Sequence, residues 1–394
     1  MGEPSTFVGR GRVQAAGCLL GGLITLIACG SERPPVSDGT YISSSGGGGG
    51  GGGGPFRDAG IPKLPGCGAQ DNGGYCDCVD TPLFADPPNI YFVLDRSGSM
   101  AENNKWDQVR QVVAQILRGL GPRANFGATV FPGFEQSSCA LPKEILPISP
   151  GDRPGDGDGP TTRALLRATS GTPYGGTPTA QALRSVLPIL RNAAGKTFVI
   201  LATDGGPNCN SAASCGFDQC MPNIENTDGC SSLGPRNCCE PPQGFREACL
   251  DAPATSSAVA ALKAAGIPVY VVGLPGTSQY GALLDDLAIS GGTALAASPK
   301  YYKVDLQSTA LLTALKKIAA KIVATCEFKL KEAPADPSKV NVYLDEVVLP
   351  ADPVNGWKIE AGTVTLLGSS CSKVLNGDVL DVRIIAGCPT VEPR

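Results

Sequence analysis

Three oxygen-bearing side chains alternate along one short segment of this sequence: Asp95, Ser97 and Ser99. Two further oxygen donors, Thr177 and Asp204, occur later in the chain, each next to glycine. Carboxylate and hydroxyl oxygens are the hard ligands that small divalent cations such as Mg²⁺ prefer. If the fold brings these residues together, they can form a divalent-cation site.

The flanking sequence indicates how such a site would be positioned. The apolar run 90–94 has the length of a buried strand and leads directly into the first segment, and the run 197–202 leads into Asp204 in the same way. Thr177 lies just before a segment with helical character. We expect Gly98 to let the first loop curl around the cation, because glycine adopts backbone conformations that other residues avoid.

The segments D-x-S-x-S (95–99), GGTPT (175–179) and TDG (203–205) together resemble the metal-ion-dependent adhesion site (MIDAS) of von Willebrand factor type A (VWA) domains. The resemblance extends over residues 88–325. It implies that Ser97, Ser99 and Thr177 contribute hydroxyl oxygens, while Asp95 and Asp204 bind the cation directly or through water. It also implies Mg²⁺, or else Mn²⁺ or Ca²⁺, and a protein ligand whose acidic residue fills an open coordination position.

Apolar strands that alternate with helices predict an α/β fold: a doubly wound, mostly parallel sheet with helices on both faces. In such sheets ligands bind beyond the carboxyl ends of the strands. From Cys326 the pattern changes to short alternating strands, which predict a small antiparallel β module over 326–394.

The expected elements of the first domain are strands 90–94, 126–131, 197–202, 267–273 and 301–304, and helices 106–120, 179–192, 254–265, 280–289 and 309–325. Those of the module are strands 327–331, 340–349, 356–359, 363–367 and 379–385.

The N-terminal region has the features of an exported lipoprotein. Basic residues precede an apolar stretch that is too short to span a bilayer but suits a signal peptide over 1–28. The segment 26–29 resembles a lipobox, which implies lipidation of Cys29 and a cell-envelope, outer-membrane location on either face. Residues 29–66, rich in Gly and Ser, are expected to form a tether, followed by a Cys-containing lead-in over 67–87.

The cysteine content agrees with an oxidising compartment. Of 16 cysteines, 14 remain after Cys18 in the signal peptide and Cys29 are set aside. An insertion over 207–250 holds seven of them, so at least one must pair outside it or stay free; a thiolate zinc cluster is the alternative. The candidates for disulfides are Cys67, Cys76, Cys78, Cys139, Cys209, Cys215, Cys220, Cys230, Cys238, Cys239, Cys249, Cys326, Cys371 and Cys388.

Composition argues against several function classes. The chain has 32 basic and 36 acidic residues and no basic run, which disfavours nucleic-acid binding. It has no histidine, which removes the commonest general base and disfavours an enzyme. We therefore favour an adhesion or assembly lipoprotein that binds protein, with the lipid as its only membrane contact. The alternatives are a structural lipoprotein with a fold-stabilising metal and, with less support, a chelatase-like protein or an enzyme with Ser97 or Ser99 as nucleophile and a Lys base.

Three smaller features give further expectations. Asp152, Asp156 and Asp158 are interpreted as a solvated acidic turn in preference to a calcium loop, because no Glu follows at the EF-hand distance. Arg96 is expected to point away from the cation, toward solvent or an acidic partner. A disulfide at Cys326 would hold the closing helix 309–325 in place, so we expect a rather fixed ligand affinity.

Overall fold

The computed structural model describes residues 79–80 and 87–394, apart from positions 153–156, 228, 243, 306–307, 324, 331–332, 346, 380, 387–388 and 393–394. The expected signal peptide, the lipidation site Cys29, the tether and most of the lead-in lie outside the described residues. So do Cys67, Cys76, Cys78 and Cys388.

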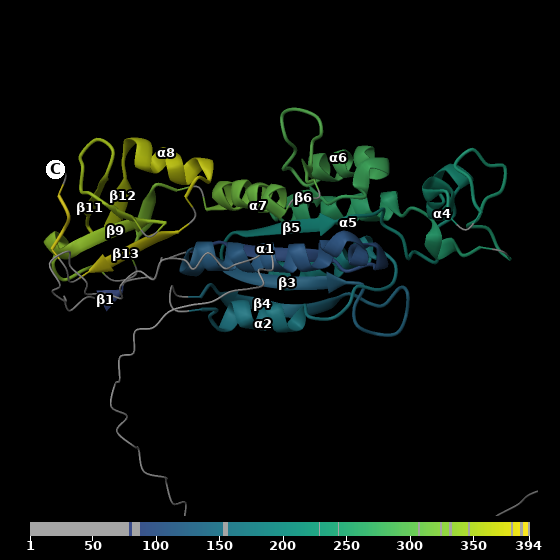
Figure 1. The fold of residues 1–394 in the computed structure, drawn as a ribbon, viewed down its shortest axis with the longest axis horizontal. Coiled ribbons are helices and arrows are strands. Elements are labelled where there is room, and N and C mark those ends of the chain that lie inside the picture. The colour runs from purple at the N-terminus through teal and green to yellow at the C-terminus, as the bar shows by residue number, and fades with distance from the viewer. Residues whose placement is uncertain are drawn as a thin grey trace, which may run out of the picture. The chain divides into compact units, whose positions relative to one another are not determined.

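A six-stranded sheet forms the centre of the first domain (Figure 1). Its strand order is β4-β3-β2-β5-β6-β7, and every neighbouring pair is parallel except β3 and β4. The α/β fold with a mostly parallel sheet is therefore confirmed. The strands are β2 (Asn89–Asp95), β3 (Asn125–Phe131), β4 (Lys143–Pro150), β5 (Thr197–Thr203), β6 (Val269–Gly273) and β7 (Tyr302–Lys303).

Helices cover both faces of this sheet, because alternate residues of each strand face opposite layers. In β2, Phe92 joins the core that contains α1 and α7, whereas Val93 joins the core that contains α3, α5 and α6. The helices are α1 (Lys105–Leu120), α2 (Pro160–Ala168), α3 (Thr179–Arg191), α5 (Ala252–Ala264), α6 (Gly281–Ser290) and α7 (Ser308–Ile322).

Two elements of this domain do not follow from the apolar pattern. β4 is a half-exposed edge strand that contains two prolines, and α2 is a short helix that begins at Pro160. Helix α3 continues for three residues beyond Pro188, although a proline inside a helix removes one backbone hydrogen bond. Pro188 is exposed, so water can satisfy the carbonyl group that loses its helical partner.

Asp152 corrects the expectation of a solvated acidic turn. Its side chain is buried, and its two carboxylate oxygens accept hydrogen bonds at 2.8 Å from the backbone N–H groups of Thr161 and Thr162. These N–H groups belong to the first turn of α2 and have no partner within the helix. Asp158 is partly exposed and pairs with Arg118 at 2.5 Å. Asp152 thus fixes the start of α2, and Asp156 lies outside the described residues.

The C-terminal module is antiparallel as predicted, and its strands form two sheets. One has the order β1-β13-β9-β10 and the other β11-β12-β8, and both are antiparallel. Their strands are β1 (Val79–Asp80), β8 (Glu327–Lys329), β9 (Val340–Leu344), β10 (Val347–Leu349), β11 (Trp357–Glu360), β12 (Thr363–Leu366) and β13 (Val382–Ala386). β1 shows that the lead-in contributes an edge strand. The helix α8 (Gly368–Asn376), which was not predicted, is joined by the disulfide Cys326–Cys371 to the chain just after α7.

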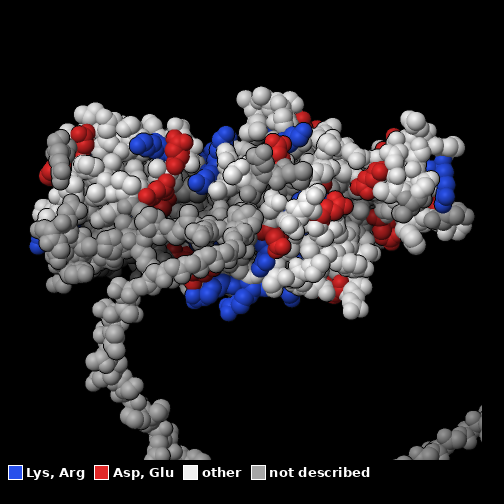
Figure 2. Space-filling view, viewed as in Figure 1, with Lys and Arg blue, Asp and Glu red and all other residues white. Residues whose placement is uncertain are grey.

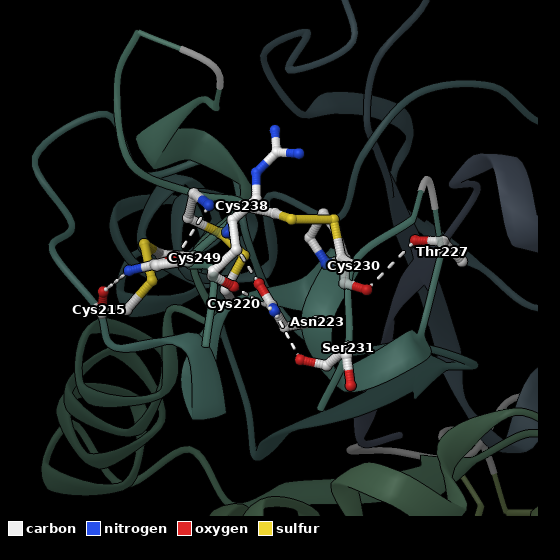
Figure 3. Close-up of a disulfide and its surroundings, with 12 residues drawn as sticks. Cys215, Cys220, Asn223, Thr227, Cys230, Ser231, Cys238 and Cys249 are labelled. Atoms are coloured by element: carbon white, nitrogen blue, oxygen red, sulfur yellow. Dashed lines mark hydrogen bonds between the residues drawn. A yellow bond between two sulfur atoms is a disulfide. The ribbon is translucent and has the colours of Figure 1, made fainter. Parts of the chain in front are cut away.

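Disulfides organise the insertion at 207–250 (Figure 3). All seven of its cysteines are paired, which excludes the thiolate zinc alternative for them. Cys209 bonds to Cys139 outside the insertion, which is one of the two outcomes that the odd count allowed. The three internal pairs are Cys215–Cys249, Cys220–Cys239 and Cys230–Cys238. The fully buried Asn223 adds hydrogen bonds to the backbone of Ser231, Arg236 and Cys238. Covalent bonds thus replace the apolar core that so short a segment cannot form.

Charges of both signs are interspersed on the face shown in Figure 2, and basic groups gather along the lower edge, where Figure 1 places α2. The exposed side of α2 carries Arg163 and Arg167. Within the part of the chain that the structure describes, no helix is both long and apolar enough to cross a membrane.

The role of Asp152 gives a first prediction. Replacing Asp152 with Ala should lower the free energy of unfolding by about 1–2 kcal/mol, because two helix-terminal N–H groups lose their acceptor. Asp158→Ala, which removes only a partly exposed ion pair, should cost less than about 1 kcal/mol. Urea denaturation of both variants measures the difference, and equal losses would contradict the capping role.

Candidate metal centre

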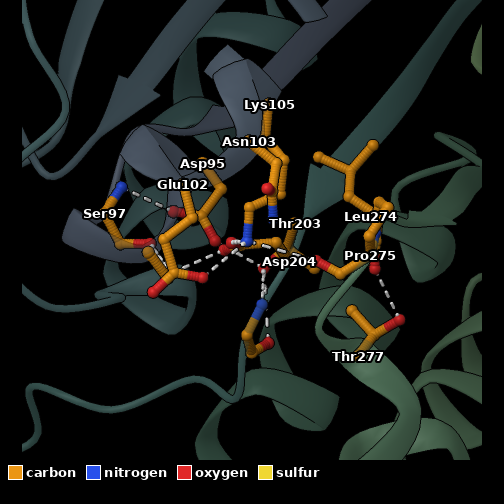
Figure 4. A network of polar contacts seen from close by, with 12 residues as sticks. Asp95, Ser97, Glu102, Asn103, Lys105, Thr203, Asp204, Leu274, Pro275 and Thr277 are labelled. Atoms are coloured by element: carbon orange, nitrogen blue, oxygen red, sulfur yellow. Dashed lines mark hydrogen bonds and ion pairs between the residues drawn. The ribbon is translucent and has the colours of Figure 1, made fainter. Parts of the chain in front are cut away.

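The candidate site lies at the carboxyl ends of β2 and β5, two neighbouring parallel strands (Figure 4). β2 ends at Asp95, and β5 ends at Thr203, one residue before Asp204. Neighbouring parallel strands end at the same edge of a sheet, so the two aspartates meet although they are far apart in sequence. Both are buried, with 0% of Asp95 and 2% of Asp204 exposed.

Hydrogen bonds connect the two aspartate loops directly. The Thr203 hydroxyl donates to Asp95 Oδ2 at 2.5 Å, and the Ser99 hydroxyl donates to Asp204 Oδ1 at 2.8 Å. Ser97 binds Asp95 Oδ1 through its backbone N–H at 2.8 Å, and its hydroxyl lies 3.1 Å from that of Ser99. The two carboxylates and two serine hydroxyls therefore form one continuous polar cluster.

The loop that carries Thr177 is attached to this cluster by its backbone. Gly98 N donates to Gly175 O at 2.9 Å, which joins it to the first loop. Thr177 N donates to the Asn208 side chain at 2.7 Å, and Asn208 N donates to Thr177 O at 2.9 Å. The Thr177 hydroxyl lies 3.9 Å from the position that a Cβ atom on Gly205 would occupy, and Gly205 is the residue that follows Asp204.

A disulfide joins the two chain segments that support the Thr177 loop, one at Ser138 and the other at Asn208. Gly176 N donates to Ser138 O at 2.6 Å, so the loop lies between Ser138 on one side and Asn208 on the other. Ser138 is followed by Cys139 and Asn208 by Cys209, and a disulfide joins these two cysteines. The insertion thus begins as a covalent brace for a candidate ligand loop.

Conformational freedom is needed at Gly175 and Gly176, not at Gly98 as expected. Gly98 has an ordinary backbone conformation, and a side chain there would meet only Gly175 O at 3.5 Å. Gly175 has φ +93°, and a Cβ atom on it would lie 2.5 Å from Ser138 O. A Cβ atom on Gly176 would lie 2.8 Å from the side chain of Asn208. The close approach of three chain segments imposes this requirement.

Lys105 is a member of the site that the sequence did not reveal. It is the first residue of α1, only 6% exposed, and its Nζ lies 2.5 Å from Asp204 Oδ2 and 3.2 Å from Pro275 O (Figure 4). A lysine at the start of an amphipathic helix is normally solvated, and no spacing rule marks this one. Only the turn between β2 and α1 directs its side chain back to the sheet edge.

Arg96 points away from the aspartates as predicted, but its surroundings differ from the expectation. It is 7% exposed, and its guanidinium donates to the carbonyl oxygens of Gly133 at 2.7 Å, Thr172 at 2.8 Å and Pro132 at 3.3 Å. Its role is to join three loops, and it faces neither solvent nor an acidic partner.

A family model of the von Willebrand factor type A domain matches residues 89–216, which include all five candidate ligands and Lys105. The chain contains a VWA domain. A search of the curated proteins found no match.

Several solved structures are similar to the chain. The pilus adhesin SpaC from Lactobacillus rhamnosus GG, in its open conformation, is 19% identical with a TM-score of 0.46, over 76% of this chain and 38% of that chain. The vWF domain of the pilus tip protein Mfa5 from Porphyromonas gingivalis is 14% identical (TM-score 0.40; 59% of this chain, 94% of that chain). Manganese-loaded Plasmodium vivax TRAP protein is 18% identical (TM-score 0.35; 60% and 74%). The chain thus spans well under half of SpaC.

The charges of the VWA site are unbalanced. Two buried carboxylates face one ammonium group, and burying a charge without a partner is costly. Burial and the neighbouring charge of Asp204 raise the pKa of Asp95 to about 7, although hydrogen bonds from Thr203 and Ser97 act in the opposite direction. Of the two buried aspartates, Lys105 pairs only with Asp204, and its other acidic neighbour, Glu102, is largely exposed. The donor set therefore fits a divalent cation, which would supply the missing positive charge to hard oxygen ligands.

All five predicted ligands are thus placed at one edge of the sheet of the VWA domain: Asp95, Ser97, Ser99, Thr177 and Asp204. The sequence analysis missed Thr203 and Asn208 as supports. Thr203 could have been found, because it immediately precedes Asp204 at the strand end. Asn208 could not, since its contact depends on the path of the insertion.

The glycine geometry of the VWA loops gives a second prediction. Gly175→Ala should lower the free energy of unfolding by about 1–3 kcal/mol, because alanine is strained at positive φ and meets a backbone oxygen. Gly98→Ala, the matched control in the adjoining loop, should be close to neutral. Thermal denaturation of both variants in EDTA measures this, and a larger loss for Gly98→Ala would contradict the geometry.

The pKa of Asp95 gives a third prediction, for the metal-free protein. Because the folded-state pKa is about 7 and the unfolded value is near 3.8, the group contributes stability below pH 3.8 that is lost as the pH rises to about 7. Its contribution should therefore fall across this window by up to about 4 kcal/mol. The measurement is the difference in unfolding free energy between the wild type and Asp95→Asn, in EDTA, from pH 4 to 8. A difference that does not depend on pH would contradict the raised pKa of the buried Asp95 carboxyl group.

Proposed function

We propose that the VWA domain binds a divalent cation, Mg²⁺ or else Mn²⁺ or Ca²⁺, and through it an acidic residue of a protein ligand. The observation that carries this proposal is the convergence of three loops on two buried carboxylates with a deficit of positive charge. A protein that only needed a stable sheet edge would have no reason to bury this charge.

In this proposal the chain's own residues divide the work. Ser97, Ser99 and Thr177 present hydroxyl oxygens, and the aspartates supply negative charge directly or through water. When bound, the cation would supply an electrophilic position for a ligand carboxylate. Thr203 and Asn208 orient Asp95 and Thr177 so that the donors are positioned before binding.

Exposure of the site supports a ligand that approaches from outside the domain. Asp95 and Ser97 are buried, whereas the neighbouring Gly98 and Ser99 are exposed. The cluster is therefore covered toward the sheet and open toward solvent at Ser99. A carboxylate from a second protein could enter from this side.

The polar contacts also support binding in preference to catalysis. The chain has no histidine, and the hydroxyl of Ser99 donates to Asp204. Lys105, the lysine in this cluster, is engaged in an ion pair and is therefore an ammonium donor without a free electron pair to act as a base. We therefore propose that the protein is not an enzyme.

The cellular setting completes the proposal. The lipobox-like segment with Cys29 and the glycine-rich tether would attach the VWA domain to the cell envelope. Five disulfides among the described cysteines are compatible with this oxidising location. We propose a lipid-anchored adhesion or assembly protein of the outer membrane.

The test combines metal binding with ligand capture. The purified full-length chain is titrated with Mg²⁺ and Mn²⁺ by calorimetry and then used to capture proteins from an envelope extract in Mg²⁺ or EDTA. We expect capture only in metal. Asp95→Ala combined with Ser97→Ala should lose both metal binding and capture, because a carboxylate and a hydroxyl ligand are removed.

The matched control is Ser170→Ala, which removes an exposed hydroxyl that donates only to Arg167 O. It should change neither property. Metal binding that raises the melting temperature without any metal-dependent capture would instead assign the cation a fold-stabilising role. Absence of metal binding would overturn the proposal.

A further inference from the structure

Lys105 occupies an unusual position for a lysine. Its side chain is 6% exposed and extends from the start of α1 to the sheet edge, where Nζ lies 2.5 Å from Asp204 Oδ2. It also donates to Pro275 O at 3.2 Å, and Glu102, which is largely exposed, lies 3.7 Å away. Figure 4 shows Nζ among the carboxylate groups of the metal site. Lysine is rarely buried unless it is paired, so the ion pair with Asp204 accounts for the burial of Lys105.

We propose that Lys105 is a permanent counter-ion that sets the affinity and selectivity of the site for divalent cations. This inference rests on the proposed function of the same site. By neutralising one carboxylate, Lys105 keeps divalent-cation binding weaker than the ligand set would otherwise allow. It also leaves the loaded site with a net positive charge.

The two oxygens of Asp204 face different partners. Oδ2 pairs with Lys105, whereas Oδ1 accepts from the Ser99 hydroxyl, a candidate ligand group. A cation bound among the hydroxyls would therefore meet Asp204 on the Oδ1 side, with the ammonium on the other side of the same carboxylate. Charges this close and this buried repel strongly.

The surroundings keep Lys105 in place. Gly276, at φ +121°, lies against Asp204 O, and a Cβ there would come within 3.7 Å of Nζ. Pro275 O supplies a second acceptor for the ammonium group. The ammonium is therefore unable to swing into solvent without leaving the buried carboxylate of Asp204 and the carbonyl group of Pro275, and it remains present when a divalent cation binds.

Charge counting gives the functional consequence. Among the buried groups, Asp95 and Asp204 contribute two negative charges, Lys105 one positive and the cation two positive, so these groups carry a net charge of about +1 in the loaded site. The carboxylate of Glu102 is largely exposed and is therefore screened by solvent. This excess favours an anionic ligand over water. With Asp204 engaged by Lys105, the direct ligands are mainly hydroxyls and water, a set that suits Mg²⁺ better than Ca²⁺, which takes more carboxylate oxygens.

The experiment compares Lys105→Met with the wild type in the full-length chain, using Mg²⁺ and Ca²⁺ alone as probes in calorimetric titrations. Methionine preserves the apolar stem and removes the charge. We expect at least about tenfold tighter Mg²⁺ binding and a larger gain for Ca²⁺, because Asp204 becomes free to coordinate directly. Lys196→Met, which removes an exposed lysine at the opposite end of β5, should leave both affinities unchanged.

Thermal denaturation provides a readout that does not require tight metal binding. In EDTA, Lys105→Met should melt below the wild type, since Asp204 is left buried without a partner, and saturating Mg²⁺ should produce a larger rise than in the wild type. Weaker or unchanged metal binding by a folded Lys105→Met would overturn the inference while leaving the proposed function intact. If only the variant binds metal, the counter-ion role stands and the proposed function fails.

Discussion

The burial of two carboxylates at one edge of a parallel sheet is the constraint on which the rest of this structure depends. Because β2 and β5 are parallel neighbours, Asp95 and Asp204 are forced together in a place that water reaches poorly. Negative charges so placed require hydrogen-bond donors and positive charge. Thr203, Ser97 and Ser99 supply donors, and Lys105 supplies one charge of the two that are needed.

The insertion over 207–250 supports the sheet edge that carries the candidate site. The C-terminal module is attached to the same domain near its last helix. The disulfide Cys139–Cys209 holds the supports of the Thr177 loop, and Asn208 completes them. The disulfide Cys326–Cys371 ties the chain after α7 to α8, which packs against α7. Disulfides thus hold both the candidate ligand loop and the chain near the last helix of the domain. The rather fixed ligand affinity expected from the sequence stays a prediction.

Much of the fold could be predicted from the sequence because the central strands are almost continuously apolar. The runs that form β2, β5 and β6 have no helical period, and the polar residues at the ends of β2 and β5 mark the candidate site. The pattern failed where burial is partial: β4 is a half-exposed edge strand, and α2 depends on the buried Asp152 to fix its first turn. Local periodicity contains no information on such contacts, which form only after the chain has folded.

The candidate ligands were predictable for the same reason, and their supports were not. Asp95 and Asp204 follow strands directly, whereas Lys105 and Asn208 reach the site through a turn and an insertion. Arg96 was placed correctly away from the site, but its three carbonyl acceptors come from loops distant in sequence.

The measurement that tests the central claim most directly is a crystal structure of the protein grown with Mn²⁺, with the ion located by anomalous scattering. The account predicts one strong anomalous peak bonded to the hydroxyl oxygens of Ser97 and Ser99, on the side of Asp204 opposite Lys105. Absence of a peak there at saturating Mn²⁺, with the loops unchanged, would contradict it.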